Sequence, residues 1–258
     1  MCRLLAYQGT PVFMESVVSK PCHSLIAQSL HATESKTPIN GDGFGLGWYG
    51  ERPEPGIYRD LRPAWSDENL LSICAQVRSP LFFAHVRAAT GTATARANCH
   101  PFSHGRNLFM HNGQIGGYTL IRRALEAMIP DELYRFRGGT TDSEVIFLAS
   151  LARGAEENAT SAFSAVLGDV HAMMREAGIT EALRFAAAFT NGKTLHAFRW
   201  ASDDKAPTLY WRRSETGVHI VSEPTDDTHS LWMAIPQGNV LIAQGGDVTV
   251  EPLLLTQH

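Results

Sequence analysis

The stretch PLFFAHVRAAT, residues 80–90, is the segment around which the rest of the chain can be interpreted. Its apolar run is short and becomes polar at its end, which is typical of a buried β-strand. Alternation along a strand places Phe82, Ala84 and Val86 on one face, and Leu81, Phe83, His85 and Arg87 on the other. The guanidinium of Arg87 at the strand end could form a surface ion pair or clamp a carboxylate with two hydrogen bonds.

Working outward from this strand, we expect mixed elements on both sides. Before it we predict a strand over 1–18 with a turn at 8–11, a helix over 24–32, a glycine-rich strand within 39–50, and a helix over 66–77 capped by Ser66. After it we predict a polar loop, a strand over 107–114, and helices over 118–128, from 140 and over 161–178. The core face of the last helix is expected to hold Phe163, Val166, Leu167, Val170, Met173, Met174 and Ala177.

From Leu183 onward the pattern is β, with a hairpin around Asn191–Gly192 and strands within 207–213, 217–224 and 239–244. The order of strands, helices and further strands predicts a layered α+β architecture. No linker divides the chain, so we expect one domain over 1–258.

Composition excludes several classes of protein. Of the 258 residues, 44% are hydrophobic and 19% charged, which suits a chain with a sizeable core. A net charge of -4 with scattered basic residues gives no argument for nucleic-acid binding. We find no apolar run of about 18 residues and no signal-peptide pattern, so we expect a cytoplasmic protein without a membrane partner. We expect four free thiols, with Cys22, Cys74 and Cys99 buried.

Cys2 is a different case from the other cysteines. A small residue after the initiator methionine permits removal of Met1, which would expose the α-amine of Cys2. An α-amine has a pKa of about 7.7 to 8.0, so a fraction of it is neutral near pH 7 and can take the thiol proton. An N-terminal cysteine can therefore be a nucleophile that carries its own base.

Two further segments carry residues suited to acyl-transfer chemistry. Asn112–Gly113 is first a turn signal, but its side-chain amide and backbone N–H could together stabilise an oxyanion. Thr141 and Glu144 have capping-box spacing, which predicts a helix start with Asp142 in the first turn. Asp142 either interacts with the helix dipole or faces a cleft, where it could hold an ammonium group.

A competing interpretation is a metal site in CHPFSHGRNLFMH, residues 99–111. Cys99, His100, His104 and His111 are all capable of binding a metal, but they match no common structural zinc spacing. We therefore predict no metal and no cofactor, and we expect His100, before Pro101, to order a loop beside the site.

Six motifs in one order carry more information than any one of them: MCRLLAY, GDGFGLGWY, FAHVRAAT, NCHPF, MHNGQ and GTTDSE, within residues 1–144. Their set resembles the class II glutamine amidotransferases, which are N-terminal nucleophile hydrolases. The resemblance implies a four-layer αββα sandwich of two mainly antiparallel sheets. Unlike many larger members, the chain has Ala88 rather than Trp after the motif arginine, and we expect no appended synthase domain. With Ser222–Pro224, it is similar to the short branch that includes γ-glutamyl hydrolases of ergothioneine synthesis and glutathione breakdown.

The resemblance also implies a role for each matching residue. Cys2 would be the nucleophile, with Asn112 and Gly113 forming the oxyanion hole. Arg87 would hold the α-carboxylate of the substrate, Asp142 its α-amino group, and Thr90 and His100 would lie beside them. The expected reaction is hydrolysis of the γ-amide of glutamine or of a γ-glutamyl compound through a thioester. Two alternatives are a glutaminase subunit that passes ammonia to a partner protein, and a non-catalytic binding or metal protein with this fold.

Overall fold

The computed structural model describes residues 2–34, 39–89 and 93–256. Within them, the first sheet has seven strands in the order β11-β9-β10-β1-β4-β2-β3. Their bounds are β1 Arg3–Phe13, β2 Phe44–Trp48, β3 Gly56–Asp60, β4 Arg78–Val86, β9 Tyr210–Arg213, β10 Gly217–Val221 and β11 Met233–Ala234. Each neighbouring pair is antiparallel. The strand β1, which begins directly after Cys2, is thus central in its sheet, with β4 on one side and β10 on the other.

The second sheet has six strands in the order β13-β12-β8-β7-β6-β5 over the described residues, again antiparallel throughout. Their bounds are β5 Phe102–His104, β6 Asn107–Ile115, β7 Leu183–Thr190, β8 Leu195–Ala201, β12 Asn239–Gln244 and β13 Asp247–Pro252. The hairpin predicted at Asn191–Gly192 joins β7 to β8.

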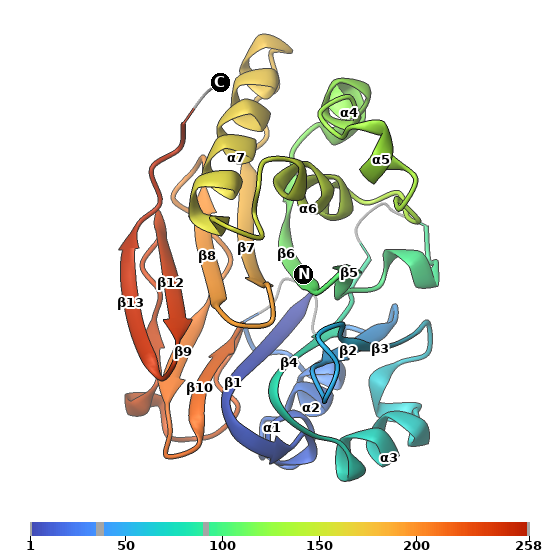
Figure 1. The fold of residues 1–258 in the computed structure, drawn as a ribbon, viewed down its shortest axis with the longest axis vertical. Coiled ribbons are helices and arrows are strands. Elements are labelled where there is room, and N and C mark those ends of the chain that lie inside the picture. Colours follow the sequence, from blue (N-terminus) through green and yellow to red (C-terminus); the bar gives the residue numbers. More distant parts are fainter. Residues whose placement is uncertain (1, 35–38, 90–92, 257–258) are drawn as a thin grey trace.

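Helices cover the outer face of each sheet. Beside the first sheet lie α1 Glu15–Val18, α2 Leu25–Leu30 and α3 Glu68–Gln76; beside the second lie α4 Tyr118–Glu126, α5 Asp131–Tyr134, α6 Asp142–Ala152 and α7 Ala159–Glu176. Figure 1 places these two helical groups at opposite ends of the view with the strands between them. Single 3-10 turns occupy Ala64–Ser66, Arg96–Asn98 and His229–Leu231.

Three apolar clusters fill the spaces between these layers. Leu4, Ala6 and Phe83 belong to the cluster shared by the two sheets, together with Met110 and Leu241. Leu5, Tyr7 and Phe82 instead pack with α1–α3, and Phe109, Val166 and Phe185 pack within the α4–α7 layer. Alternate residues of β1 therefore face different cores, as the period of a strand requires. The predicted αββα sandwich is confirmed.

Four local predictions are wrong at least in part. The turn at 8–11 is instead a register irregularity within β1 between Gln8 and Val12, where Thr10 N–H bonds Thr216 O at 2.8 Å. Ser66 lies in a 3-10 turn, and α3 is capped by Asp67, whose Oδ1 accepts from Leu70 N at 2.7 Å. Cys22 is exposed rather than buried, while Cys74 and Cys99 are buried as expected. On α7 the expected core face is buried except for Met173, which is half-buried, and Ala177, which is exposed.

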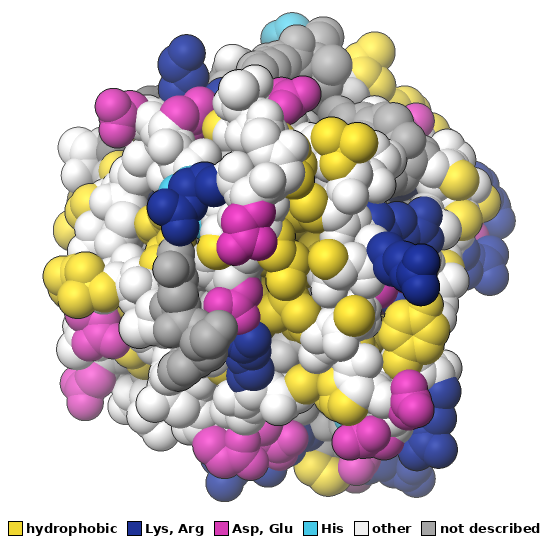
Figure 2. Space-filling view, turned by 90° about the horizontal axis from the view of Figure 1, so that it is seen from above, with side chains coloured by type: hydrophobic (Ala, Val, Ile, Leu, Met, Phe, Trp, Pro, Cys, Tyr) yellow, Lys and Arg dark blue, Asp and Glu magenta, His cyan; other side chains and the backbone are white. Residues whose placement is uncertain are grey.

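The molecular surface agrees with the charge pattern of the sequence. Figure 2 shows one face on which acidic and basic side chains are interspersed around an apolar strip. Among the described residues, the helices include none that is both long and apolar enough to cross a membrane.

Candidate active site

Cys2 immediately precedes β1. The first residues of β1 form hydrogen bonds on one side with the segment of β4 and on the other with the segment that follows β10. Arg3 is in register with Val86 of β4, so Cys2 lies beside the end of β4 where Arg87 follows. The Cys2 Sγ donates a hydrogen bond to the carbonyl oxygen of Ala88 at 3.6 Å. On the other side, Leu4 N donates to Ser222 Oγ at 3.1 Å, and Ser222 N donates to Leu4 O at 3.0 Å. The position of Cys2 is therefore determined by backbone contacts from two distant parts of the chain.

A cavity of about 370 Å³ opens at Cys2. Five of the seven residues predicted for the site line this cavity: Cys2, Arg87, His100, Gly113 and Asp142. These residues come from the start of β1, the end of β4, the loop before β5, the strand β6 and the first turn of α6. Asn112 is the buried neighbour of Gly113, and Thr90 lies outside the described residues. The volume falls within the range of about 300 to 1,000 Å³ common for small-molecule sites.

Asn112 and Gly113 are not in a turn, so the turn interpretation is wrong. Both lie inside β6, opposite Ala186 and Phe185 of β7. Asn112 is 1% exposed, and its Nδ2 has no hydrogen-bond partner among the described residues. A buried amide donor without a partner is costly unless something binds it, so this group is available to a ligand oxygen. Asn112 follows Met110 by two positions, which places its side chain on the face of β6 turned toward the first sheet.

Arg87 is buried, with 3% of its surface exposed, which excludes the surface ion pair considered from the sequence. Its Nη1 donates to Asp42 O and its Nη2 to Ala93 O, both at 3.3 Å. In the backbone, Asp42 N donates to Arg87 O at 3.0 Å and Arg87 N donates to Gly43 O at 2.8 Å. In addition, Asp42 Oδ2 accepts a hydrogen bond from Ala89 N at 2.7 Å. Asp42 therefore organises the strand end around Arg87. Sequence reasoning missed it, because its only signal was an acidic residue between two glycines.

Asp142 begins α6, and Thr141 caps that helix by accepting from Glu144 N at 3.3 Å. The two oxygens of the Asp142 carboxylate accept from Ile115 N and Ser143 N, each at 2.8 Å, which ties α6 to the end of β6. The second hydrogen bond of a capping box, from Thr141 N to the Glu144 carboxylate, is absent from the described contacts. The Glu144 carboxylate instead accepts from Gly138 N and Gly139 N at 3.0 and 2.7 Å.

Two buried histidines, His100 and His111, line the cavity, and a third, His85, packs against His100. His85 and His100 have ring centroids 4.4 Å apart, and their ring nitrogens have no hydrogen-bond partner among the described residues. Burial lowers the pKa of His85 to about 3 and that of His100 well below its ordinary value. His111 bonds Ser143 Oγ at 2.8 Å, and burial lowers its pKa too, although Asp142 opposes that shift. All three rings are neutral near pH 7.

The surroundings of Cys2 favour the protonated thiol over the thiolate. Burial raises its pKa, and the nearby guanidinium of Arg87 partly opposes the rise. Attack by this sulfur therefore requires a base, because only the thiolate is a strong nucleophile.

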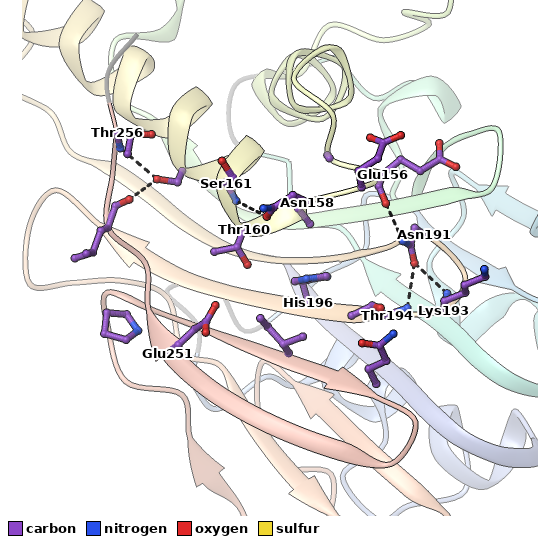
Figure 3. Close-up of a pocket in the computed structure, with 18 residues that line it drawn as sticks. Glu156, Asn158, Thr160, Ser161, Asn191, Lys193, Thr194, His196, Glu251 and Thr256 are labelled. Carbon is purple, nitrogen blue, oxygen red and sulfur yellow. Dashed lines mark hydrogen bonds between the residues drawn. The ribbon is translucent and has the colours of Figure 1, made fainter.

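Two other features of the molecule lie away from Cys2. A cavity of about 670 Å³, larger than the one at Cys2, lies between the start of α7, the β7–β8 hairpin and β12–β13, with Asn158, Asn191, His196 and Glu251 around it (Figure 3). It contains no cysteine and none of the predicted site residues. The metal-capable residues Cys99, His100, His104 and His111 do not form a ligand group, whereas Cys22, His23 and Asp227 have ligand atoms within 4.8 Å of one another on the exposed surface.

Two curated proteins are similar to this chain over nearly all of its length. The chain is 29% identical to a protein named probable glutamine amidotransferase DUG3 from Saccharomyces cerevisiae, over 98% of this chain and 85% of that protein. It is also 29% identical to the γ-glutamyl-hercynylcysteine sulfoxide hydrolase of Mycolicibacterium smegmatis, over 98% and 100% of the two chains.

Solved structures give the same result. A glutamine aminotransferase class-II domain protein from Silicibacter pomeroyi superimposes with a TM-score of 0.78 and 38% identity, over 98% of this chain and 99% of the other. The glutamine phosphoribosylpyrophosphate amidotransferase of B. subtilis, at 13% identity and a TM-score of 0.66, shares the fold over 99% of this chain and 50% of its own. The family model for class II glutamine amidotransferases matches residues 1–215, and the chain therefore belongs to that family.

Proposed function

We propose that the protein hydrolyses the γ-amide bond of glutamine or of a γ-glutamyl compound, with Cys2 as nucleophile. The observation that carries the proposal is the single cavity in which a thiol, a guanidinium and a carboxylate meet beside an unpartnered amide donor. Arg87 and Asp142 have the charges needed for the two ends of an amino acid, its α-carboxylate and its α-ammonium group. Asn112 Nδ2 and the Gly113 backbone N–H are the donors for the oxyanion.

The reaction divides into acylation and deacylation. Once Met1 is removed, the α-amine of Cys2 takes the thiol proton, and the sulfur attacks the γ-carbonyl carbon to form a C–S bond and an oxyanion. When the tetrahedral intermediate collapses, the C–N bond breaks and the ammonium group returns the proton to the leaving amine. Water then attacks the thioester, the amine accepts a proton from it, and the C–S bond breaks to release glutamate and the free thiol.

Two forms of this proposal differ in the leaving group attached to the γ-glutamyl group, which is either ammonia or a larger amine. The mycobacterial relative is named for a γ-glutamyl sulfoxide, which favours a hydrolase that releases an amine larger than ammonia. The yeast relative is named a glutamine amidotransferase, which favours a glutaminase that delivers ammonia to a partner protein. We favour the hydrolase, because the alignment covers 98% of this chain and all of the mycobacterial enzyme, but only 85% of the yeast relative.

We also propose that residues 1–258 form one domain. The family match ends at residue 215, but β10 pairs with β1 and β12 pairs with β8. The C-terminal strands therefore extend both sheets instead of building a separate core.

The test of the proposed function is a substrate panel. Glutamine, γ-glutamyl peptides and γ-glutamyl amines are each incubated with the protein, and glutamate release is measured. Cys2→Ala should abolish release, while Cys22→Ala, at an exposed free thiol, should leave it unchanged. The proposal fails if no panel member yields glutamate, or if Cys2→Ala retains the wild-type rate. Turnover of glutamine that appears only with an added partner protein would favour the amidotransferase subunit.

A further inference from the structure

The residue after Cys2 carries one of the most deeply buried charges of the molecule. The Arg3 side chain is 1% exposed, and its Nε and Nη1 have no hydrogen-bond partner among the described residues. Because Leu4 faces the space between the sheets and Leu5 faces the α1–α3 layer, alternation directs Arg3 away from the side that Cys2 occupies. Arg3 is not part of the lining of the cavity at Cys2. Any effect of Arg3 on the reaction must therefore act through the backbone or through its charge.

Glu223 is the acidic partner of Arg3. It is 6% exposed, and its Oε2 lies 4.0 Å from Arg3 Nε. Its carboxylate accepts hydrogen bonds from Thr33 N at 3.0 Å, from Thr33 Oγ1 at 2.5 Å and from Glu34 N at 3.0 Å. Arg3 Nη2 donates to Glu34 O at 2.7 Å. Arg3 and Glu223 thus hold the same two-residue segment, Thr33–Glu34, from two sides.

The segment that carries Glu223 also holds the strand that carries Cys2. Ser222, its neighbour, exchanges two hydrogen bonds with Leu4, and Gln28 Nε2 donates to Glu223 O at 3.2 Å. The side chain and backbone of Ser222–Glu223 therefore contact β1 at Arg3 and at Leu4, the two residues that follow Cys2. This cluster lies across the first sheet from the substrate cavity, beside a smaller cavity of about 350 Å³ lined by Gln28, Thr33, Glu34 and Glu223.

We propose that Glu223 is a positioning residue for Cys2, acting through its buried ion pair with Arg3. This rests on the proposed function of Cys2 as nucleophile. A buried guanidinium without a counter-charge is unfavourable, so loss of the Glu223 carboxylate drives Arg3 toward solvent and moves the start of β1 with it. Cys2 then leaves its place in the cavity beside Arg87, while the proposed substrate-binding groups that follow β4 and begin α6 remain in position.

The variants that test this are Glu223→Gln, Arg3→Met and the double variant, all in the full-length protein. We expect each single variant to lower kcat by ten- to a hundredfold with little change in KM, since a misplacement of about 1 Å can cost about 100-fold. The double variant should lose no more activity than the worse single variant, because both act through one pair. Glu223→Asp should recover part of kcat, and Asp226→Asn, which breaks the nearby Arg212–Asp226 pair, should leave kcat unchanged.

A second readout reports on Cys2 without any substrate. Alkylation of the N-terminal peptide by iodoacetamide is followed by mass spectrometry against pH, with the exposed Cys22 of the same molecule as the reference. In Glu223→Gln and Arg3→Met the midpoint for Cys2 should move to higher pH, because the thiol loses the nearby charge of Arg3. The midpoint for Cys22 should not move.

The outcomes separate the two proposals. An unchanged or lower midpoint for Cys2 in both variants, or an unchanged kcat per folded molecule alongside a lowered melting temperature, would overturn the positioning role. If the wild-type protein releases no glutamate from any γ-glutamyl compound, the proposed function fails, and the alkylation profile still decides whether Glu223 positions Cys2. If Glu223→Gln does not fold, Arg3→Lys keeps the charge but changes the geometry of the pair, so kcat should still fall, by less than in Arg3→Met, while the midpoint for Cys2 stays close to that of the wild type. An unchanged kcat in both Arg3→Lys and Arg3→Met would then overturn the positioning role.

Discussion

At the scale of single residues, the cavity combines groups whose ionisation is shifted in opposite ways. Burial keeps the Cys2 thiol protonated by raising its pKa, and burial keeps His85 and His100 neutral by lowering theirs. Neutral rings near Arg87 add no further positive charge to a site that, under the proposed function, binds both a carboxylate and an ammonium group. Neither ring is thereby suited to be the base for the thiol, a role that we propose for the α-amine of Cys2, since a base with a pKa far below 7 takes up a proton weakly.

Asn112→Ala tests the unpartnered amide donor. We expect kcat for glutamate release to fall by about 100- to 1,000-fold, because an oxyanion would lose one of its donors, while KM changes little. Steady-state kinetics measure the effect, and thermal unfolding should remain close to that of the wild type because Nδ2 makes no hydrogen bond among the described residues. Asn69→Ala, on the exposed face of α3, is the matched control. A rise in KM with unchanged kcat would assign Asn112 to ground-state binding instead.

At the scale of elements, the strongest local patterns gave correct predictions. The buried strand β4, the helices α6 and α7 and the β7–β8 hairpin each have a hydrophobic period or a turn pair contained in their own residues. The errors occur where a distant segment decides the local structure. Gln8–Pro11 would turn if β10 were not paired with β1, and Asn112–Gly113 would turn if β7 did not continue the ladder of β6.

The same limit applies to the site. Five of its seven predicted residues line one cavity, but Asp42, Ser143 and the Arg3–Glu223 pair did not appear among the candidates. Each of these acts through a contact with a residue far away in the sequence, such as Asp42 with Arg87 or Ser143 with His111. No period or spacing within a single chain records such contacts.

Gly113→Ala tests the close packing of β6 against β7. A Cβ at this position would lie 1.9 Å from the carbonyl oxygen of Arg184, so the two strands must separate locally. We expect loss of glutamate release together with a lower melting temperature, measured by circular dichroism. Gly50→Ala is the matched control, because its Cβ would meet no atom within 4 Å and its backbone requires no positive φ. A Gly113→Ala protein with wild-type stability and activity would show that β6 tolerates the displacement.

At the scale of the whole molecule, buried histidines link stability to pH. Burial lowers the pKa of His85 to about 3 and those of His196 and His219 to about 4. The unfolded chain binds protons near its ordinary histidine pKa of about 6.5, while the folded protein does not. Stability is therefore fully present above about pH 6.5 and is lost as the pH falls toward the folded values.

We expect the free energy of unfolding in urea to fall between pH 7.5 and pH 5, by up to about 2 kcal/mol for each such histidine. His196→Gln, at the edge of the large cavity in Figure 3, should reduce this loss by about 1 to 2 kcal/mol. His31→Gln, at an exposed histidine, is the matched control. Equal pH dependence in His196→Gln and the wild type would contradict this origin.

The place of β10 in the first sheet sets the order in which the molecule can be completed during synthesis. β1 can pair with β4 once residue 86 has left the ribosome, but its other neighbour, β10, becomes available only after residue 221. The first strand made is therefore among the last to be enclosed. Until then the N-terminus stays open to aminopeptidases, so any trimming that exposes the amine of Cys2 can precede the closure of its surroundings. If Cys2 is the nucleophile that we propose, the topology separates exposure of its amine from assembly of the site in time.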